Sequence, residues 1–259
     1  MAPTKPAPED MQRSQSLTHL YLIRHAEAVC NVDQDAPTAG MNGDLGLTDL
    51  GKLQAERLRE RLAATGEIVA DVLIASTLLR ARQTAEIIAP AIGLPITWDD
   101  EVQELRVGEI DGVPWRAIAH TVPDFRAEPF RPLSPGGENW PQFVLRVATA
   151  LERIAREHEG KTIVVVCHGG VIDSSFVIFS GLSSVVFPSL DLATRNTSIT
   201  HWERRAENGQ PPRWRLRGYN DDLHVRDIGA EERIRWPRAN PTATGGAEEP
   251  AVPLPTEER

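Results

Sequence analysis

Two histidines in this chain each stand where a buried strand would end. His25 follows the apolar run 20–23 and Arg24, and His168 follows the β-branched stretch 162–167. In open α/β sheets, ligands bind outside the carboxyl ends of the strands, so polar residues at such ends are candidates for a site. A neutral imidazole can attack phosphorus or transfer protons. A lone Arg-His pair also fits a surface arginine beside a core histidine, so the interpretation depends on the residues that accompany it.

Two arginines and a carboxylate accompany the histidines. Arg24 directly precedes His25, Arg80 falls in the first turn of an expected helix, and Glu104 follows a short strand candidate. The planar guanidinium is suited to phosphate, and the first turn of a helix presents unpaired N–H groups to an anion. Two arginines, two histidines and one carboxylate at a sheet edge suffice for phosphoryl transfer without a metal.

Strand-like and helix-like stretches alternate along the chain, which predicts an α/β fold. We expect a three-layer sandwich with a mostly parallel central sheet and helices on both faces. The expected strands are 18–23, 71–75, 95–98, 162–167, 198–203 and 213–218, the last two around an Asn208-Gly209 turn, and the expected helices are 47–65, 78–91, 138–157 and 171–180, with one helical turn at 115–120.

Particular residues are expected to shape these elements. Thr48 is predicted to cap the first helix, whose Leu53, Leu58 and Leu62 are spaced to face a core, and Ser76 is predicted to cap the second. The unbroken β-branched stretch 162–167 is typical of a central strand buried on both faces.

We predict one domain over residues 17–237, between a flexible arm, 1–16, and a disordered tail, 238–259, whose composition cannot bury a core. The proline-rich segment 105–136 is predicted to form a cap loop over the sheet. We expect its aromatic residues Trp115, Phe125 and Phe130 to pack the cap onto the sheet. No role is assigned to Arg126 and Arg131.

Composition limits the classes of function. No apolar run approaches the roughly 20 residues needed to span a bilayer, and the net charge of −9 argues against general nucleic-acid binding. The two cysteines, Cys30 and Cys167, are too few for a disulfide framework, which favours the cytoplasm. The other five histidines show no metal-ligand spacing, so neither a metal nor another cofactor is expected.

Several motifs together resemble the histidine phosphatase superfamily, in its phosphoglycerate-mutase-like branch 1 marked by an Arg-His-Gly motif. The resemblance runs from about residue 20 to residue 200, and its order and spacing make chance unlikely. The matching stretches are RHAE at 24–27 followed by Asn31, LTDLGKLQA at 47–55, STLLRARQTA at 76–85, Glu104 with GEIDG at 108–112, PGGE at 135–138 and CHGG at 167–170.

The resemblance implies a metal-independent phosphomonoesterase of the histidine acid phosphatase type, acting on a small phosphorylated metabolite. His25 would be the nucleophile that becomes phosphorylated, and Glu104 the proton donor and acceptor. The phosphoryl oxygens would be held by Arg24, Arg80 and a cationic His168, with Asn31 and Gly169 as further substrate contacts. Taken alone, Glu104 would be a solvated acid in an acidic loop, with Glu109 and Asp111 as the alternative acids.

The chain departs from the family pattern at three places. Ala26 replaces the motif glycine, Ile110 and Asp111 stand where Trp and Glu are frequent, and Asn139 stands in place of a serine.

Two other functions remain as alternatives. A cofactor-dependent phosphoglycerate mutase would have a longer insertion after the acid than 105–136, and a non-catalytic phospho-ligand-binding protein would need no nucleophile and acid together. The motifs handle the phosphoryl group and do not name the substrate.

Overall fold

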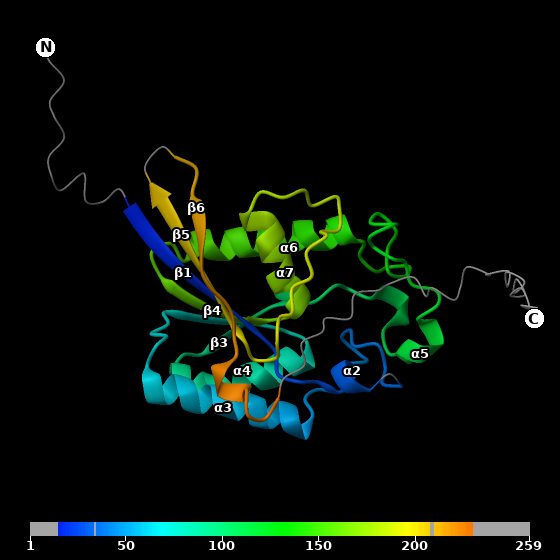
Figure 1. The fold of residues 1–259 in the computed structure, drawn as a ribbon, viewed down its shortest axis with the longest axis horizontal. Coiled ribbons are helices and arrows are strands. Elements are labelled where there is room, and N and C mark those ends of the chain that lie inside the picture. The colour runs from blue at the N-terminus through cyan, green and yellow to red at the C-terminus, as the bar shows by residue number, and fades with distance from the viewer. Residues whose placement is uncertain (1–14, 34, 208–209, 230–259) are drawn as a thin grey trace, which may run out of the picture.

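The computed structural model describes residues 15–33, 35–207 and 210–229, and it is built on one six-stranded sheet (Figure 1). The strand order is β3-β2-β4-β1-β5-β6. The first four of these strands pair in parallel, and β5 and β6 continue the sheet antiparallel, so the predicted mostly parallel sheet is confirmed. The strands are β1 Gln15–Arg24, β2 Val72–Ser76, β3 Ile96–Asp99, β4 Thr162–Cys167, β5 Ile199–Glu207 and β6 Arg213–Asp221.

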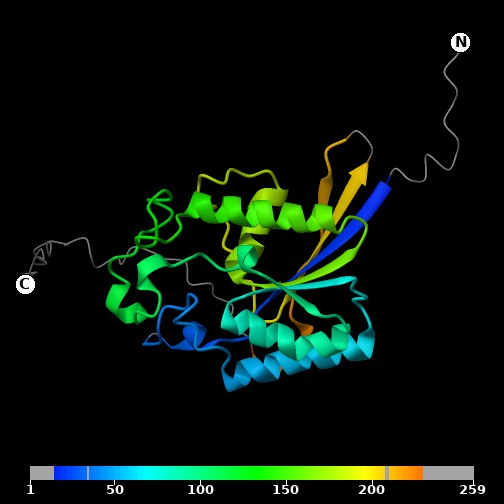
Figure 2. The ribbon, with the colours of Figure 1, turned by 180° about the vertical axis from the view of Figure 1, so that it is seen from behind.

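Helices cover both faces of the sheet, as predicted. Helices α3 and α4 lie on one face, and α6 and α7 lie on the other (Figures 1 and 2). The α-helices are α2 Val29–Val32, α3 Asp49–Thr65, α4 Leu79–Ile92, α5 Trp115–Ile118, α6 Trp140–Glu157 and α7 Gly169–Phe179, and the 3-10 turns are η1 Asp100–Val102, η2 Gly108–Ile110 and η3 Leu223–Val225. Within the described residues, no helix is long and apolar enough to cross a membrane.

Alternate residues of the central strand β4 enter two separate cores. Ile163 and Val165 belong to the core under α6 and α7, whereas Val164 and Val166 belong to the core under α3 and α4. All four side chains are fully buried. The prediction of a strand buried on both faces is therefore confirmed, and this strand holds its carboxyl end rigidly between those of β1 and β2.

Helix ends follow the sequence signals in two cases. Thr48 accepts a hydrogen bond from the Gly51 N–H and begins α3, as predicted. Asn139, one of the three departures from the family pattern, begins α6: its side chain accepts from the Gln142 N–H while the Gln142 side chain accepts from the Asn139 N–H. This reciprocal pair is a capping box, in which asparagine serves as well as serine.

Two details of the predicted elements are wrong. Strand β1 begins at Gln15, so the last two residues of the predicted arm 1–16 pair in the sheet. Leu53 is 41% exposed, because the buried stripe of α3 instead runs through Gly51, Gln54, Ala55, Leu58 and Leu62. Three other predicted segments, residues 1–14, the Asn208-Gly209 turn and the tail 238–259, lie outside the described residues.

The segment 105–136 contains η2, α5, an isolated bridge from Pro114 to Pro37 and otherwise irregular chain. Phe125 is 1% exposed and packs in the core beneath α6, whereas Phe130 is 64% exposed, so its predicted packing role is wrong. Arg126 stacks over the Phe187 ring, and Arg131 pairs with Glu128.

Candidate active site

The carboxyl ends of three adjacent parallel strands meet beside one cavity. Strand β1 ends at Arg24, β4 ends at Cys167 and β2 ends at Ser76, and Arg24 pairs directly opposite Cys167. The cavity has a volume of about 180 Å³. Of the seven predicted site residues, six line it, namely Arg24, His25, Asn31, Arg80, Glu104 and Gly169, and the seventh, His168, is fully buried with its ring centroid 5.2 Å from that of His25.

The protonation of the His25 ring is determined by its two hydrogen-bond neighbours. Nδ1 lies 2.7 Å from the Ala26 carbonyl oxygen, which can only accept, so Nδ1 carries the proton. Arg80 Nε–H donates to Nε2 at 3.3 Å, so Nε2 carries the lone pair. Burial, together with the charges of Arg80 and Arg24, holds the pKa of His25 well below its usual value. His25 is therefore a neutral imidazole whose Nε2 is available as a nucleophile.

Arg80 is held in place by a carboxylate that the sequence analysis did not identify. Its Nη1 lies 2.7 Å from Asp44 Oδ2, and both side chains are nearly inaccessible to solvent. The Arg80 backbone N–H donates to the same oxygen, and Arg80 Nη1 also donates to the Ala39 carbonyl. Asp44 Oδ1 accepts from the Gly46 N–H. A buried arginine with this many fixed partners presents its remaining N–H groups in one orientation.

Arg24 brings a second buried guanidinium to the site from the end of β1. It is 2% exposed, and its Nη1 donates to the Thr194 carbonyl. The chain beyond Thr194 also supports the histidine, because the Asn196 side chain donates to the His25 carbonyl at 2.9 Å. Two guanidinium groups thus lie beside one neutral imidazole in a largely buried site, an arrangement that attracts a phosphoryl dianion.

His168 is oriented by Ser76, and this corrects an expectation about Ser76. Ser76 does not cap α4, because the residue that begins this helix is Leu78, which has no side-chain cap. Ser76 Oγ instead lies 2.7 Å from His168 Nε2 and accepts from the Leu78 N–H. The serine hydroxyl can therefore donate its hydrogen bond to Nε2, and the proton of the neutral ring is then on Nδ1. That Nδ1 is buried and has no hydrogen-bond partner among the described residues.

His168 is also neutral rather than cationic as expected. Burial lowers its pKa well below the usual value, and the nearby Arg80 and His25 lower it further. A cationic ring would be surrounded by like charge in a site from which water is excluded. His168 can therefore offer one neutral N–H donor to an anion, while the full positive charges come from the two arginines.

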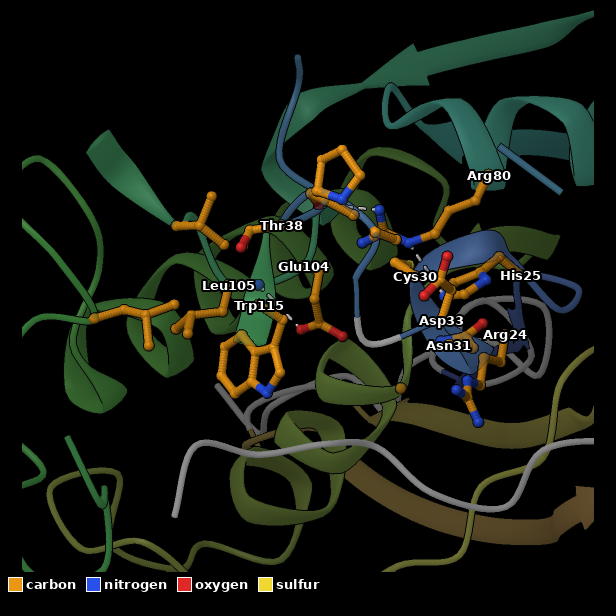
Figure 3. A pocket seen from close by; sticks show the side chains of 16 residues that line it. Arg24, His25, Cys30, Asn31, Asp33, Thr38, Arg80, Glu104, Leu105 and Trp115 are labelled. Atoms are coloured by element: carbon orange, nitrogen blue, oxygen red, sulfur yellow. Dashed lines mark hydrogen bonds between the residues drawn. The ribbon is translucent and has the colours of Figure 1, made fainter. Parts of the chain in front are cut away.

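Glu104 lies at the junction between the charged and the apolar parts of the cavity. Figure 3 shows its carboxylate between Leu105 and Trp115 on one side and the group formed by His25 and the arginines on the other. Glu104 Oε2 accepts from the Gly170 N–H in the first turn of α7, and Oε1 accepts from the Leu105 N–H. These bonds fix the carboxylate at the border between the charged part and the apolar part of the cavity.

The alternative acids do not share this position. Asp111 accepts from the N–H groups of Gly40, Asn42 and Gly43, so it holds the loop 40–43 in place. Glu109 is exposed and does not line the cavity. Asn31 does line it, and its Oδ1 accepts from the Ala28 N–H at the start of α2.

The departure at Ala26 is accommodated by the surrounding structure. Ala26 is fully buried, and its N–H donates to Thr84 Oγ1 at 3.0 Å. Its carbonyl is the acceptor for His25 Nδ1, and a backbone carbonyl is present whatever the residue type. In the part of the chain that the structure describes, no three or more His, Cys, Asp or Glu side chains are grouped to hold a metal ion.

Comparisons with known proteins give a consistent picture. The model of the histidine phosphatase superfamily, branch 1, matches residues 20–222. A metal-independent phosphoserine phosphatase of Arabidopsis thaliana is 27% identical over 87% of this chain and 90% of its own length. Phosphoglycerate mutase-like protein 4 of the same plant is 30% identical over 81% and 88%. A solved mycobacterial glucosyl-3-phosphoglycerate phosphatase in complex with VO3 is 26% identical, with a TM-score of 0.61, over 78% of this chain and 98% of that structure.

Proposed function

The chain belongs to branch 1 of the histidine phosphatase superfamily, and we propose that it is a metal-independent phosphomonoesterase that forms a phosphohistidine on His25. The observation that carries this proposal is the fixed tautomer of His25, with Nδ1–H on the Ala26 carbonyl and the Nε2 lone pair beside two arginines. The relative named as a metal-independent phosphoserine phosphatase supports hydrolysis of a small phosphorylated metabolite.

In the first step, His25 Nε2 forms a bond to phosphorus while the bond from phosphorus to the ester oxygen breaks. In this proposal Glu104 is protonated when the ester is bound, and it gives its proton to the departing oxygen. The Ala26 carbonyl accepts from the Nδ1–H of the ring, which is now positively charged. Arg24, Arg80 and the His168 Nδ1–H bind the three equatorial oxygens, where negative charge remains through the transition state.

In the second step, Glu104 as carboxylate takes a proton from water while the water oxygen attacks the phosphorus. The bond between phosphorus and Nε2 breaks, so His25 returns to its neutral form and phosphate is released. The short segment 105–136 favours water as the acceptor of the phosphoryl group. A mutase would instead transfer that group to a second hydroxyl of the substrate.

We also propose the cytoplasm as the compartment, a proposal that the free cysteines Cys30 and Cys167 support.

The intermediate gives a direct test. Enzyme quenched in alkali during turnover of p-nitrophenyl phosphate in excess chelator should carry an acid-labile, base-stable phosphate on His25. His25→Ala should abolish turnover and labelling, whereas His120→Ala, at an exposed histidine, should keep both. Label on serine, aspartate or cysteine, or an absolute requirement for added Mg²⁺ or Zn²⁺, would contradict the mechanism.

The role of Glu104 predicts a dependence on the leaving group. Glu104→Gln should cripple hydrolysis of alkyl phosphates, whose alkoxides leave poorly without a proton, and should slow phosphorylation by aryl phosphates much less. Because the carboxylate is still missing when water attacks, p-nitrophenyl phosphate should give a burst of nitrophenol and a slow steady state. Glu109→Gln, at an exposed acid, is the matched control. Equal losses on both ester types without a burst would show that Glu104 is not the acid.

A further inference from the structure

The cavity continues beyond the phosphoryl site into a part that is almost entirely apolar, which we call the leaving-group pocket. Glu104 marks its border, and Figure 3 shows Leu105 and Trp115 on the side away from His25. Two parts of the chain build its walls, namely the loop after α2 and the cap segment 105–136. The residues are Pro37, Ala39, Leu105, Val107, Trp115 and Leu133.

The charges around this pocket are one-sided. Among the described residues that line the cavity, the only cations are Arg24 and Arg80, and both lie at the phosphoryl end beside His25. The other charged lining residues are the acids Asp33 and Glu104. The Thr38 hydroxyl, which also lines the cavity, is engaged as a donor to the Val113 carbonyl at 2.6 Å.

The arginines nearest in sequence to the pocket walls are paired with acids elsewhere. Arg116, next to Trp115, pairs with Asp35, and both side chains are mostly exposed. Arg106, next to Leu105, pairs with Glu101. A carboxylate on the leaving group would therefore be desolvated against apolar walls, and no cation among the described lining residues would pair with it there.

We infer that this enzyme takes phosphomonoesters whose alcohol part is uncharged and apolar, such as small alkyl or aryl phosphates. It discriminates against esters that carry a carboxylate, the class to which phosphoserine and phosphoglycerates belong. The inference rests on the proposed phosphatase function, since it concerns the leaving group of that reaction. The apolar walls bind the alcohol part in proportion to the area they cover, and Glu104 at the border reaches its oxygen.

A matched pair of substrates tests this. Butyl phosphate and 4-(phosphonooxy)butanoate differ only in that a terminal methyl group is replaced by a carboxylate. We expect kcat/KM to be at least about tenfold higher for butyl phosphate, because an unpaired buried charge costs more than one lost hydrogen bond. Equal values, or a preference for the carboxylate, would overturn the inference while leaving the phosphatase function intact.

Variants at Val107, which is half-buried, add a charge to the wall. Val107→Lys should shift the kcat/KM ratio several-fold toward the carboxylate ester, and the neutral Val107→Met should not. Both substrates are measured on one preparation, so a partly folded variant does not change the ratio. An unchanged ratio in Val107→Lys would show that the wall does not set the preference.

Binding separates failure of the inference from failure of the proposed function. If p-nitrophenyl phosphate and both esters are all left uncleaved, the phosphatase function is wrong. Calorimetry with butylphosphonate and 4-phosphonobutanoate then still decides the preference of the pocket. Tighter binding of butylphosphonate supports the inference, and equal or tighter binding of 4-phosphonobutanoate overturns it.

Discussion

Replacing Asp44 with asparagine would measure how much the reaction depends on a carboxylate that does not itself line the cavity. The substitution keeps the shape of the side chain and removes its charge. The new amide retains an oxygen for the Gly46 N–H, but the Arg80 guanidinium and the Arg80 backbone N–H lose the oxygen that now accepts from both.

The expected loss of stability follows from the burial of the ion pair between Arg80 and Asp44. The side chains of Arg80 and Asp44 are 5% and 1% exposed, so solvent cannot replace the lost partner. Removing one member of a buried ion pair costs about 3–5 kcal/mol, and the retained bond to Gly46 puts this variant near the lower end. About 3 kcal/mol in a domain of this size lowers Tm by about 6–12 °C. Because Arg80 also contacts His25, loss of its fixed orientation should lower kcat about a hundredfold.

The assay is turnover of p-nitrophenyl phosphate at 20 °C, with folding checked by circular dichroism, together with the Kd for vanadate. A purely structural role for Asp44 would lower Tm and leave kcat and vanadate binding of the folded enzyme unchanged. We expect kcat to fall and the Kd for vanadate to rise. Asp49→Asn is the matched control, because Asp49 is fully exposed and pairs with Lys52 in the first turn of α3. A kcat within threefold of the parent would refute the positioning of Arg80 by Asp44.

The two other predictions concern the histidines. Ser76→Ala should lower kcat/KM about tenfold, because His168 loses the hydroxyl that fixes its tautomer, and should also lower Tm, because the buried His168 Nε2 and Leu78 N–H lose their partner. Ser76→Thr should recover most of the activity, and full activity in Ser76→Ala would remove this role. The free energy of unfolding should decrease as the pH falls from about 6.5 toward 4, since burial lowers the pKa of His201 and of His224 to about 4 and also lowers those of His25 and His168. Below pH 6.5 the unfolded chain binds protons that the folded chain does not, so the free energy of unfolding falls by up to about 1.4 kcal/mol per pH unit for each of the buried His25 and His168. The partly exposed His201 and His224 contribute less, because solvent screens their charges. Urea unfolding between pH 7.5 and pH 4.5 measures the effect, and a flat profile would contradict the assigned burial.

The elements could be predicted because their signals are local. The β-branched run 162–167 and the cap residue Thr48 each specify structure within a few residues, and the structure has both as expected. Leu53 could not be placed, because the contact face of α3 is chosen by close packing: a Cβ on Gly51 would lie 1.9 Å from the Glu27 carbonyl. This close approach turns Gly51 inward and leaves Leu53 in solvent.

The residues of the candidate site could be predicted because they stand in motifs, but their supports could not. Asp44 lies in a glycine-containing loop whose sequence is typical of a turn, and it contacts a residue 36 positions away. Ser76 looks like a helix cap from its local sequence, and only the sheet order, which puts β2 next to β4, makes it a neighbour of His168. The charge of His168 depends on burial and on arginines from other elements, so the expectation of a cationic ring failed for a tertiary reason.

The two histidines thus obtain their tautomers in different ways, and this explains where the sequence can vary. The acceptor for His25 Nδ1 is the carbonyl of the next residue, so alanine at position 26 preserves it as well as glycine would. The partner of His168 Nε2 is a side chain on another strand, so position 76 requires a hydroxyl. The tautomer of His25 is therefore set by the backbone of its own strand end, whereas the tautomer of His168 depends on the assembled sheet. A substitution that disturbs the packing of β2 against β4 should accordingly affect His168 before it affects His25.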